Sequence, residues 1–221
     1  MIVTLDGPAG AGKSSTARAL AARLGWCHMD TGAMYRAVAL VALERGVPLE
    51  DAGRLATLAE ALAIEFRDGR VFADGRDISA EIRTERVTAA TRPVADATPV
   101  REALKRLQRR LAEGRDIVAE GRDQGSVVFP GAELKVFLTA TPEERARRRC
   151  REDAARGVEL PFEQVLRAQN RRDDGDRTRP VGAMRPAPDA VLVETDGRSP
   201  DEVVDLIVSL IEERRGPTST P

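Results

Sequence analysis

Residues 7–14 read Gly-Pro-Ala-Gly-Ala-Gly-Lys-Ser, which fills every fixed position of the pattern G-x-x-x-x-G-K-[ST]. Residues 2–5, shortly upstream, form an apolar run with β-branched side chains, and such a run predicts a buried parallel strand. Residues 14–24 have helix-forming composition, and their apolar side chains are spaced along one helical face. The order of strand, glycine-rich loop and helix therefore predicts a P-loop in an α/β fold.

The chemistry of a P-loop follows from its backbone. Glycines allow successive N–H groups to point at phosphate oxygens, and the N-terminus of the following helix adds partial positive charge. Lys13 would reach the β- and γ-phosphates, and the Ser14 hydroxyl would ligate Mg²⁺. A glycine-rich turn before an ordinary helix is the alternative, but the flanking strand and helix argue against it. The predicted ATP-binding residues are Gly7, Pro8, Ala9, Gly10, Ala11, Gly12, Lys13, Ser14 and Ser15.

Composition limits the remaining possibilities. The chain has 221 residues, enough for one α/β domain with insertions. A formal net charge of −1 argues against bulk attachment to nucleic acid. Two cysteines make no disulfide framework, and no apolar run is long enough to cross a membrane. We expect a cytoplasmic monomer without a targeting segment, whose partners are neither nucleic acid nor membrane.

The rest of the chain alternates between strand-like and helix-like segments, as a parallel sheet requires. Further strands are predicted at residues 26–29, 117–119, 134–138 and 190–194. Helices are predicted at residues 33–44, 55–63, 100–113, 142–156, 162–172 and 200–214. The predicted fold class is α/β, a P-loop NTPase core with a parallel sheet flanked by helices.

Residues 64–78 interrupt the alternation. Two Asp-Gly pairs, at residues 68–69 and 74–75, stand between short runs of alternating polarity. Such pairs are typical of tight hairpins, so the segment predicts a small antiparallel sheet, with a long surface loop as the alternative. We assign this sheet to a region inserted at residues 31–100 of a single domain that spans the whole chain. At the C-terminus we expect a flexible tail at residues 216–221.

Two charged clusters are candidates for ligand binding. Residues 171–180 hold four Arg and three Asp, and a run of this kind is usually solvated, but a helix and a strand hold its two ends. Its arginines can donate to phosphate, and its carboxylates can accept from sugar hydroxyls or a base amine. Residues 120–123, Glu-Gly-Arg-Asp, follow a predicted strand at the sheet edge where open α/β sheets bind ligands. A capped turn with a surface ion pair is the alternative there.

Seven segments in series resemble the bacterial cytidylate kinases. They are GPAGAGKSS at 7–15, DTGAMYR at 30–36, the predicted hairpins, EIRTERV at 81–87, VREAL at 100–104, EGRDQGSVVFP at 120–130 and RRDDGDRTRP at 171–180. The resemblance extends from residue 2 to about residue 195 in the same order. It implies a nucleoside monophosphate kinase in which residues 31–100 bind CMP and residues 148–180 form a mobile lid with acceptor contacts.

The implied reaction transfers the γ-phosphoryl group of ATP, with Mg²⁺, to CMP or dCMP. The second pKa of the acceptor phosphate is about 6, so the acceptor is largely dianionic at pH 7 and needs no general base. The obstacle is to bring two anions together, and cations and positioning therefore dominate catalysis. A chain with one His and many arginines suits that demand.

The resemblance also implies roles for single residues. Arg36 and Arg122 would hold the CMP phosphate, and Arg101 the base or its surroundings. Tyr35 would pack beside the acceptor, and a place in the hydrophobic core is an equal alternative for this residue. Asp123 and Arg179 would contact the cytosine edge, and Asp176, with Arg172, the ribose hydroxyls. The implied catalytic cations are Lys13, Arg36, Arg122 and Arg179. The implied acceptor contacts are Thr31, Tyr35, Arg36, Arg101, Gly121, Arg122, Asp123, Arg172, Asp176 and Arg179, and the candidates to clamp ATP are Arg148, Arg149 and Arg151.

The chain departs from the family pattern at a few positions. Thr31 stands where Ser is common, and Arg92 replaces a Ser that contacts the base. Glu120 stands where Asp is usual, and Gln124 where an apolar residue is frequent. These differences bear on base recognition and leave the implied reaction class unchanged.

Two other functions remain open. A P-loop kinase of a hydroxyl substrate such as shikimate needs a carboxylate near the acceptor oxygen, and Asp30 could supply it. A non-catalytic ATP-binding module is the second alternative, against which the abundant arginines argue. A GTPase would carry an N-K-x-D motif, but the one Asn, Asn170, is followed by Arg171.

Overall fold

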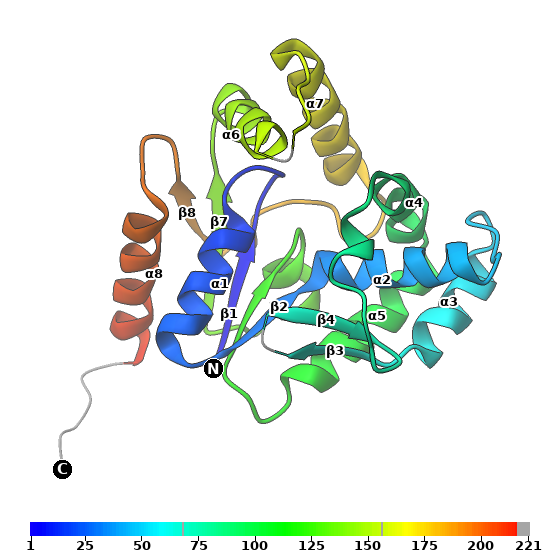
Figure 1. Ribbon diagram of the computed structural model, residues 1–221. Coiled ribbons are helices and arrows are strands. Elements are labelled where there is room, and N and C mark those ends of the chain that lie inside the picture. The colour runs from blue at the N-terminus through cyan, green and yellow to red at the C-terminus, as the bar shows by residue number, and fades with distance from the viewer. Residues whose placement is uncertain (68, 156, 216–221) are drawn as a thin grey trace. The chain divides into compact units, whose positions relative to one another are not determined.

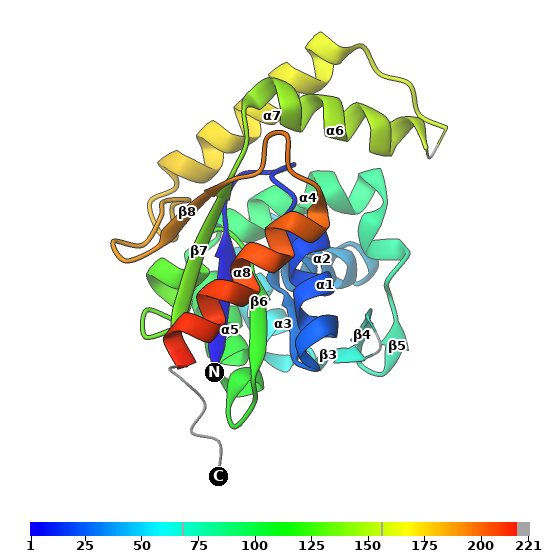
Figure 2. The same ribbon diagram turned by 90° about the vertical axis from the view of Figure 1, so that its left-hand side faces the viewer.

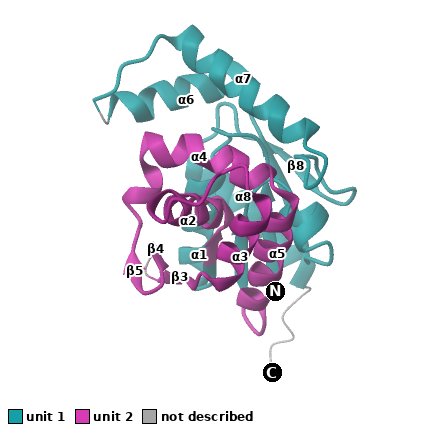
Figure 3. Cartoon of the chain, turned by 90° about the vertical axis from the view of Figure 1, so that its right-hand side faces the viewer, with its two compact units in different colours: residues 1–27, 116–221 teal, residues 28–115 magenta. Residues whose placement is uncertain are grey.

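The computed structural model describes residues 1–67, 69–155 and 157–215 (Figure 1). The chain divides into two compact units, which Figure 3 colours separately. Unit 1 comprises residues 1–27 and 116–221, and unit 2 comprises residues 28–115. Each has a hydrophobic core of its own, and each is described by itself.

Unit 1 is built on a parallel sheet. β1 (Ile2–Asp6) lies between β6 (Ile117–Glu120) and β7 (Leu134–Thr139), and β8 (Val191–Glu194) pairs with β7. The strand order is β2-β6-β1-β7-β8, in which β2 (Cys27–Asp30) begins where the chain leaves unit 1. The first strand is almost wholly buried because it is flanked on both edges, as its apolar sequence predicted.

Helices cover this sheet. α1 (Lys13–Leu24) and α8 (Pro200–Arg215) pack against each other, and Figures 1 and 2 show them on one face. Leu20 and Ile207 are fully buried in the core beneath them. The helices α6 (Pro142–Ala154) and α7 (Phe162–Thr178) form a second packed pair. The predicted α/β class with a parallel sheet flanked by helices is therefore confirmed.

Unit 2 is mainly helical. Its helices are α2 (Thr31–Glu44), α3 (Ala52–Ala61), α4 (Glu85–Asp96) and α5 (Thr98–Ala112), and the short 3₁₀ turn η1 (Glu81–Arg83) precedes α4. α2 is apolar around most of its circumference, which is the pattern of a buried helix. It forms the middle of the core of this unit.

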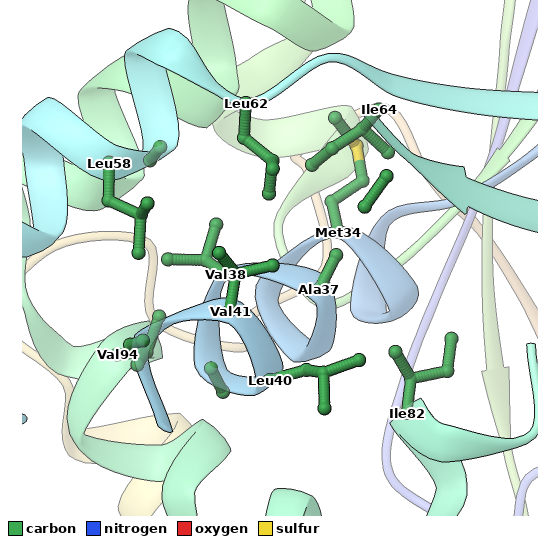
Figure 4. Packing of buried hydrophobic residues seen from close by; sticks show 14 of the residues in the cluster. Met34, Ala37, Val38, Leu40, Val41, Leu58, Leu62, Ile64, Ile82 and Val94 are labelled. Atoms are coloured by element: carbon green, nitrogen blue, oxygen red, sulfur yellow. The ribbon is translucent and has the colours of Figure 1, made fainter. Parts of the chain in front are cut away.

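Figure 4 shows how the core of unit 2 packs around α2. Met34 and Val38 are fully buried and lie on the side of the helix that faces Leu62. Leu58 of α3 and Ile64, the first residue of the next strand, complete this side. The apolar helix α2 is therefore the element around which the rest of unit 2 packs.

The small antiparallel sheet predicted from the Asp-Gly pairs is present in unit 2. β3 (Ile64–Arg67) pairs with β4 (Arg70–Ala73), which pairs with β5 (Arg76–Asp77), and both pairings are antiparallel. Asp74 and Gly75 in the second turn have φ angles of 49° and 79°, as a type I′ turn requires. Asp68 of the first turn and the tail expected at 216–221 lie outside the described residues.

The sequence did not predict α4. Pro93 interrupts its pattern, because proline removes a backbone donor inside a helix. The structure shows that Val87, Ala90 and Val94 are buried at helical spacing and that Thr84 caps the N-terminus by accepting from the Val87 N–H at 3.4 Å. Burial of this face outweighs the effect of one missing hydrogen bond near the end of the helix.

Helix α7 is longer than predicted. We expected a helix over 162–172, but it extends to Thr178 and includes most of the charged run and Gly175. Asp173 and Asp176 are buried, and each accepts hydrogen bonds from arginine side chains. The run is therefore mostly helical, with Asp173 and Asp176 packed in the interior of unit 1 while Arg171, Arg172, Asp174 and Arg177 remain exposed.

Among the residues that the structure describes, no helix combines the length and apolarity that a membrane span requires.

Candidate active site

The loop between β1 and α1 has the tight backbone that its glycines predicted. Gly7 has a φ of 136°, and a Cβ at this position would lie 2.0 Å from the backbone oxygen of Leu138. Gly10 has a φ of 78°, and its Cβ would lie 3.0 Å from the Cβ of Arg145. Larger residues are therefore excluded, and the loop passes directly between β7 and α6.

Lys13 is buried at the first position of α1. Only 6% of it is exposed, and its Nζ donates to the Pro8 carbonyl oxygen at 2.7 Å. Burial, and then repulsion from Arg122, hold the pKa of Lys13 well below its usual range, although Glu120 acts in the opposite direction. A buried ammonium beside other cations is stabilised by an anion, so this position favours a phosphate ligand.

Ser14 and Glu120 join the P-loop to the end of β6. The Ser14 hydroxyl donates to Glu120 Oε2 at 2.6 Å, and Glu120 is 3% exposed. Hydroxyl and carboxylate oxygens are ligands that Mg²⁺ accepts, commonly together with phosphate oxygens. The sequence had marked Glu120 as part of a charged cluster at the sheet edge and as a departure from the family pattern. Its side chain is one methylene longer than that of Asp, which gives it reach toward the P-loop. In the described part of the chain, no three His, Cys, Asp or Glu residues are grouped so that they could hold a metal ion by themselves.

The loop after β6 is anchored to the end of β1. Gly121 N–H donates to the Leu5 carbonyl oxygen at 3.0 Å. The Asp6 carboxylate accepts from the N–H groups of Gln124 and Gly125, at 2.9 and 2.7 Å, where the chain makes a single π-turn, η2 (Gln124–Val128). Burial raises the pKa of Asp6 to about 6, against the effect of these two N–H donors. No motif or spacing in the sequence had indicated this role of Asp6.

Arg122, Asp176 and Arg179 form one charged cluster in unit 1. Asp176 Oδ2 accepts from Arg122 Nε at 2.9 Å, and its Oδ1 accepts from Arg179 Nη2 at 2.8 Å. Burial alone would raise the pKa of Asp176, but the attraction of Arg122 and Arg179 outweighs it and holds this pKa below its ordinary value. Arg172 interacts electrostatically with both Asp176 and Lys13.

The structure thus gathers most of the predicted site residues of unit 1 beside the P-loop. Asp123 is 4% exposed and lies near enough to Asp6 to contribute to its raised pKa. Both oxygens of Asp176 accept from arginines, so in this structure it orders the cations. Its implied contact with ribose stays a prediction, as do the substrate contacts of Gly121, Arg122, Asp123, Arg172 and Arg179.

The remaining predicted contacts belong to unit 2. Thr31 begins α2 and is buried, while Tyr35 and Arg36 lie further along the same helix. Arg36 Nη1 donates to the Ile82 carbonyl oxygen at 3.1 Å and to Thr88 Oγ1 at 2.8 Å. The guanidinium of Arg101, from α5, lies 5.6 Å from the centre of the Tyr35 ring. Tyr35 therefore packs against an arginine, a contact that agrees with either interpretation of this residue.

Two questions left by the sequence are answered in part by unit 2. Asp30 accepts from the Ala33 N–H at 2.9 Å as the N-cap of α2, which is a structural use of the carboxylate proposed for a hydroxyl-directed kinase. Arg92 is 61% exposed at its side chain and forms an ion pair with Asp96 at 3.6 Å, one turn further along α4.

The arginines of α6 differ in their positions. Arg149 pairs with Asp153 at 2.9 Å, and Arg151 with Glu144 at 3.2 Å. Arg148 donates to the hydroxyl and carbonyl oxygens of Thr195, and its Nη1 would lie 3.8 Å from a Cβ at Gly12. Arg148 is therefore the one of the three candidates that these distances place against the P-loop.

A parallel sheet, a glycine-rich phosphate loop with a buried lysine after β1, and Arg122 just after β6 define a P-loop protein of the kinase type. A family model described as cytidylate kinase matches residues 3–213. A cytidylate kinase of Rhodopirellula baltica is 53% identical over 213 residues, covering 96% of this chain and 93% of that protein. A cytidylate kinase of Vibrio cholerae is 44% identical over 217 residues, covering 96% of each. The chain belongs to the cytidylate kinase family.

Solved structures support the fold. A gluconokinase from Sinorhizobium meliloti superposes with a TM-score of 0.50 at 18% identity, covering 99% of this chain and 97% of that one. An uncharacterized protein from Eubacterium ventriosum gives a TM-score of 0.54 at 9% identity, with 96% and 98% covered. At these identities the likeness concerns architecture alone.

Proposed function

We propose that the chain transfers the γ-phosphoryl group of ATP to CMP and dCMP, forming CDP and dCDP. The family supports this reaction, and one structural observation carries it. Lys13, buried in the P-loop, interacts with Arg122 and Arg172, which share the buried carboxylate of Asp176. Such a concentration of cations suits the meeting of two anionic phosphate chains.

The ATP end of the site is the P-loop. Its main-chain N–H groups and the N-terminus of α1 would bind the phosphates, and Lys13 would approach the β- and γ-phosphates. Ser14 and Glu120 fit a Mg²⁺ ion because their oxygens already lie 2.6 Å apart. The ion, when bound, would offset negative charge on the transferred group. Arg148 is the proposed additional clamp on ATP, because its guanidinium lies next to Gly12.

The acceptor contacts are proposed for each unit by itself. In unit 1 these are Gly121, Arg122, Asp123, Arg172, Asp176 and Arg179, and in unit 2 they are Thr31, Tyr35, Arg36 and Arg101. The arginines would orient the phosphate of CMP in line with that of ATP. No side chain has to remove a proton, because the acceptor phosphate is already largely dianionic at pH 7.

Base selection is proposed to depend on Asp123 and Arg179. A buried carboxylate that accepts from the exocyclic amine of cytosine would face a carbonyl oxygen in uracil, and it would then lose its partner. Asp123 suits this role because it is 4% exposed. Discrimination against UMP is therefore expected to arise from the carboxylate and not from the size of the base.

A coupled assay of ADP release tests the proposal. Purified protein is given ATP and Mg²⁺ with CMP, dCMP, UMP, AMP or shikimate as the acceptor. We expect turnover with CMP and dCMP and much weaker turnover with UMP and AMP. Turnover with shikimate alone would support the hydroxyl-directed kinase, which the capping role of Asp30 does not favour, and ATP binding without turnover of any acceptor would support the binding module.

We also propose that the protein works as a monomer in the cytoplasm, where its nucleotide substrates are found, and without a nucleic-acid partner. Every proposed contact comes from a single chain, so the reaction needs no second copy. Sedimentation at the concentration used in the assay tests the monomer, and a dimer there would contradict it.

A further inference from the structure

A buried ion pair connects the P-loop to the helix that carries the proposed CMP contacts. Arg145, on α6, is 2% exposed, and Asp173, on α7, is 1% exposed. Arg145 Nη1 donates to Asp173 Oδ2 at 2.6 Å and also to the carbonyl oxygen of Ala9 at 2.9 Å. The same nitrogen therefore joins a carboxylate of α7 to the backbone of the phosphate-binding loop.

The contact with the P-loop is close. Arg145 Nε donates to the Ala140 carbonyl oxygen at 3.1 Å, which holds the guanidinium in its plane. A Cβ on Gly10 would lie 3.0 Å from the Cβ and 3.1 Å from the carbonyl oxygen of Arg145. Figures 1 and 2 show the loop between β1 and α1 close to α6. A shift of Arg145 would therefore displace Ala9 and Gly10.

Asp173 occupies a particular place on α7. It follows Arg172 directly and precedes Asp176 by one helical turn, and both of these are proposed to contact the acceptor. Its second oxygen, Oδ1, is buried and has no hydrogen-bond partner among the described residues. A carboxylate with one unsatisfied oxygen is an expensive group to bury, so its retention in the interior is not explained by stability alone.

We propose that Arg145 and Asp173 are positioning residues for phosphoryl transfer, and that their ion pair holds the P-loop in register with α7. Neither residue is proposed to touch a nucleotide. The proposal rests on the proposed function, because the register matters only if α7 carries the acceptor contacts. Small displacements between reacting groups are enough to slow an enzyme, since a misplacement of about 1 Å can reduce the rate roughly 100-fold.

The proposal predicts that a change on α7 affects the ATP end of the site. For Asp173→Asn, we expect kcat to fall at least tenfold and the dissociation constant of a non-hydrolysable ATP analogue, measured without CMP, to rise at least threefold. Asp174→Asn is the matched control, because Asp174 is adjacent on the same helix but exposed, with only a 3.5 Å ion pair to Arg177. Both quantities should stay within twofold of wild type in the control.

A double variant separates positioning from stability. Breaking one side of a buried pair is strongly destabilising, whereas apolar residues in place of both partners are often neutral or stabilising. Arg145→Met/Asp173→Leu should therefore unfold near the wild-type temperature and yet keep the low kcat, because Ala9 has lost its donor. If the double variant recovers both the wild-type kcat and the wild-type unfolding temperature, the proposal is overturned. A normal kcat and a normal affinity for the ATP analogue in Asp173→Asn would overturn it as well.

The outcome can be distinguished from a failure of the proposed function. Wild-type turnover of CMP is measured in the same assay, and its absence would refute the function. The affinity for the ATP analogue needs no acceptor, so it reports on the link between α7 and the P-loop in either case. An analogue affinity unchanged in Asp173→Asn would refute the link whether or not CMP is the acceptor.

Discussion

The ionisation of Asp6 should destabilise the folded protein, and the substitution Asp6→Asn tests this. Asp6 is 4% exposed, and burial raises its pKa from 3.8 to about 6. A pKa that is higher in the folded than in the unfolded state means that the folded state binds the proton more tightly. The resulting stabilisation is complete below pH 3.8 and is lost as the pH rises through about 6.

The size of the effect follows from the shift. A change of about two pKa units corresponds to roughly 3 kcal/mol between the two protonation states. Asn cannot ionise, so this component vanishes in the variant. Its amide nitrogen would face the N–H of Gln124 or Gly125, and that loss of roughly 1–3 kcal/mol does not depend on pH. The pH-dependent difference between the two proteins therefore isolates the charge.

Urea unfolding at pH 4 and at pH 7.5 measures this difference. Relative to wild type, Asp6→Asn should gain up to about 3 kcal/mol of unfolding free energy between the lower and the higher pH. Asp77→Asn is a control that should show little pH-dependent difference, because hydrogen bonds from Ser79 hold the pKa of Asp77 below its ordinary value of 3.8 and the group stays ionised in the folded protein at both pH values. If the pH dependence of wild type and Asp6→Asn is parallel, the buried carboxylate is not the source and the reasoning fails.

Three further outcomes concern activity and binding. Lys13→Ala should lower kcat by roughly 100-fold or more while the circular dichroism spectrum is unchanged, because Lys13 would neutralise charge in the transition state; near-normal turnover would contradict a phosphate-binding P-loop. Binding of an ATP analogue should take up protons, since phosphate would raise the low pKa of Lys13; calorimetry in two buffers should show unequal enthalpies. If the same inequality persists in Lys13→Met, the protons come from elsewhere. Arg179→Ala should raise the KM for CMP and weaken selection against UMP; unchanged selectivity in steady-state kinetics would remove Arg179 from the base pocket.

The sequence predicted those parts of the fold whose signal is local. The P-loop has fixed residue types at fixed spacing, and the second Asp-Gly pair needs only its two residues to specify a left-handed turn. Helix α4 was missed because its stability comes from packing of Val87 and Val94 in the core of unit 2, and Pro93 obscured the pattern. Tertiary packing of this kind is absent from a local window.

The site was predictable to a similar degree. Residue types identified Lys13 and Arg122, but nothing in the spacing indicated that Asp6 would bind the N–H groups of Gln124 and Gly125 across the sheet. The contact between Ser14 and Glu120 joins residues 106 positions apart, and it became visible only when the parallel order of β1 and β6 was known. Contacts of this range depend on topology, which a motif does not contain.

The buried carboxylates of α7 explain how so many cations can stand in one place before any nucleotide binds. Arg122 and Arg172 repel Lys13, and burial makes the charge of Lys13 more costly still. Asp176 offsets this by accepting from Arg122 and Arg179 with its two oxygens. The guanidinium groups are thereby fixed in direction by the protein itself, so little reorganisation is required when phosphate oxygens arrive. An acidic residue among the arginines therefore favours the binding of anions, because it keeps the arginines ordered at the sheet edge.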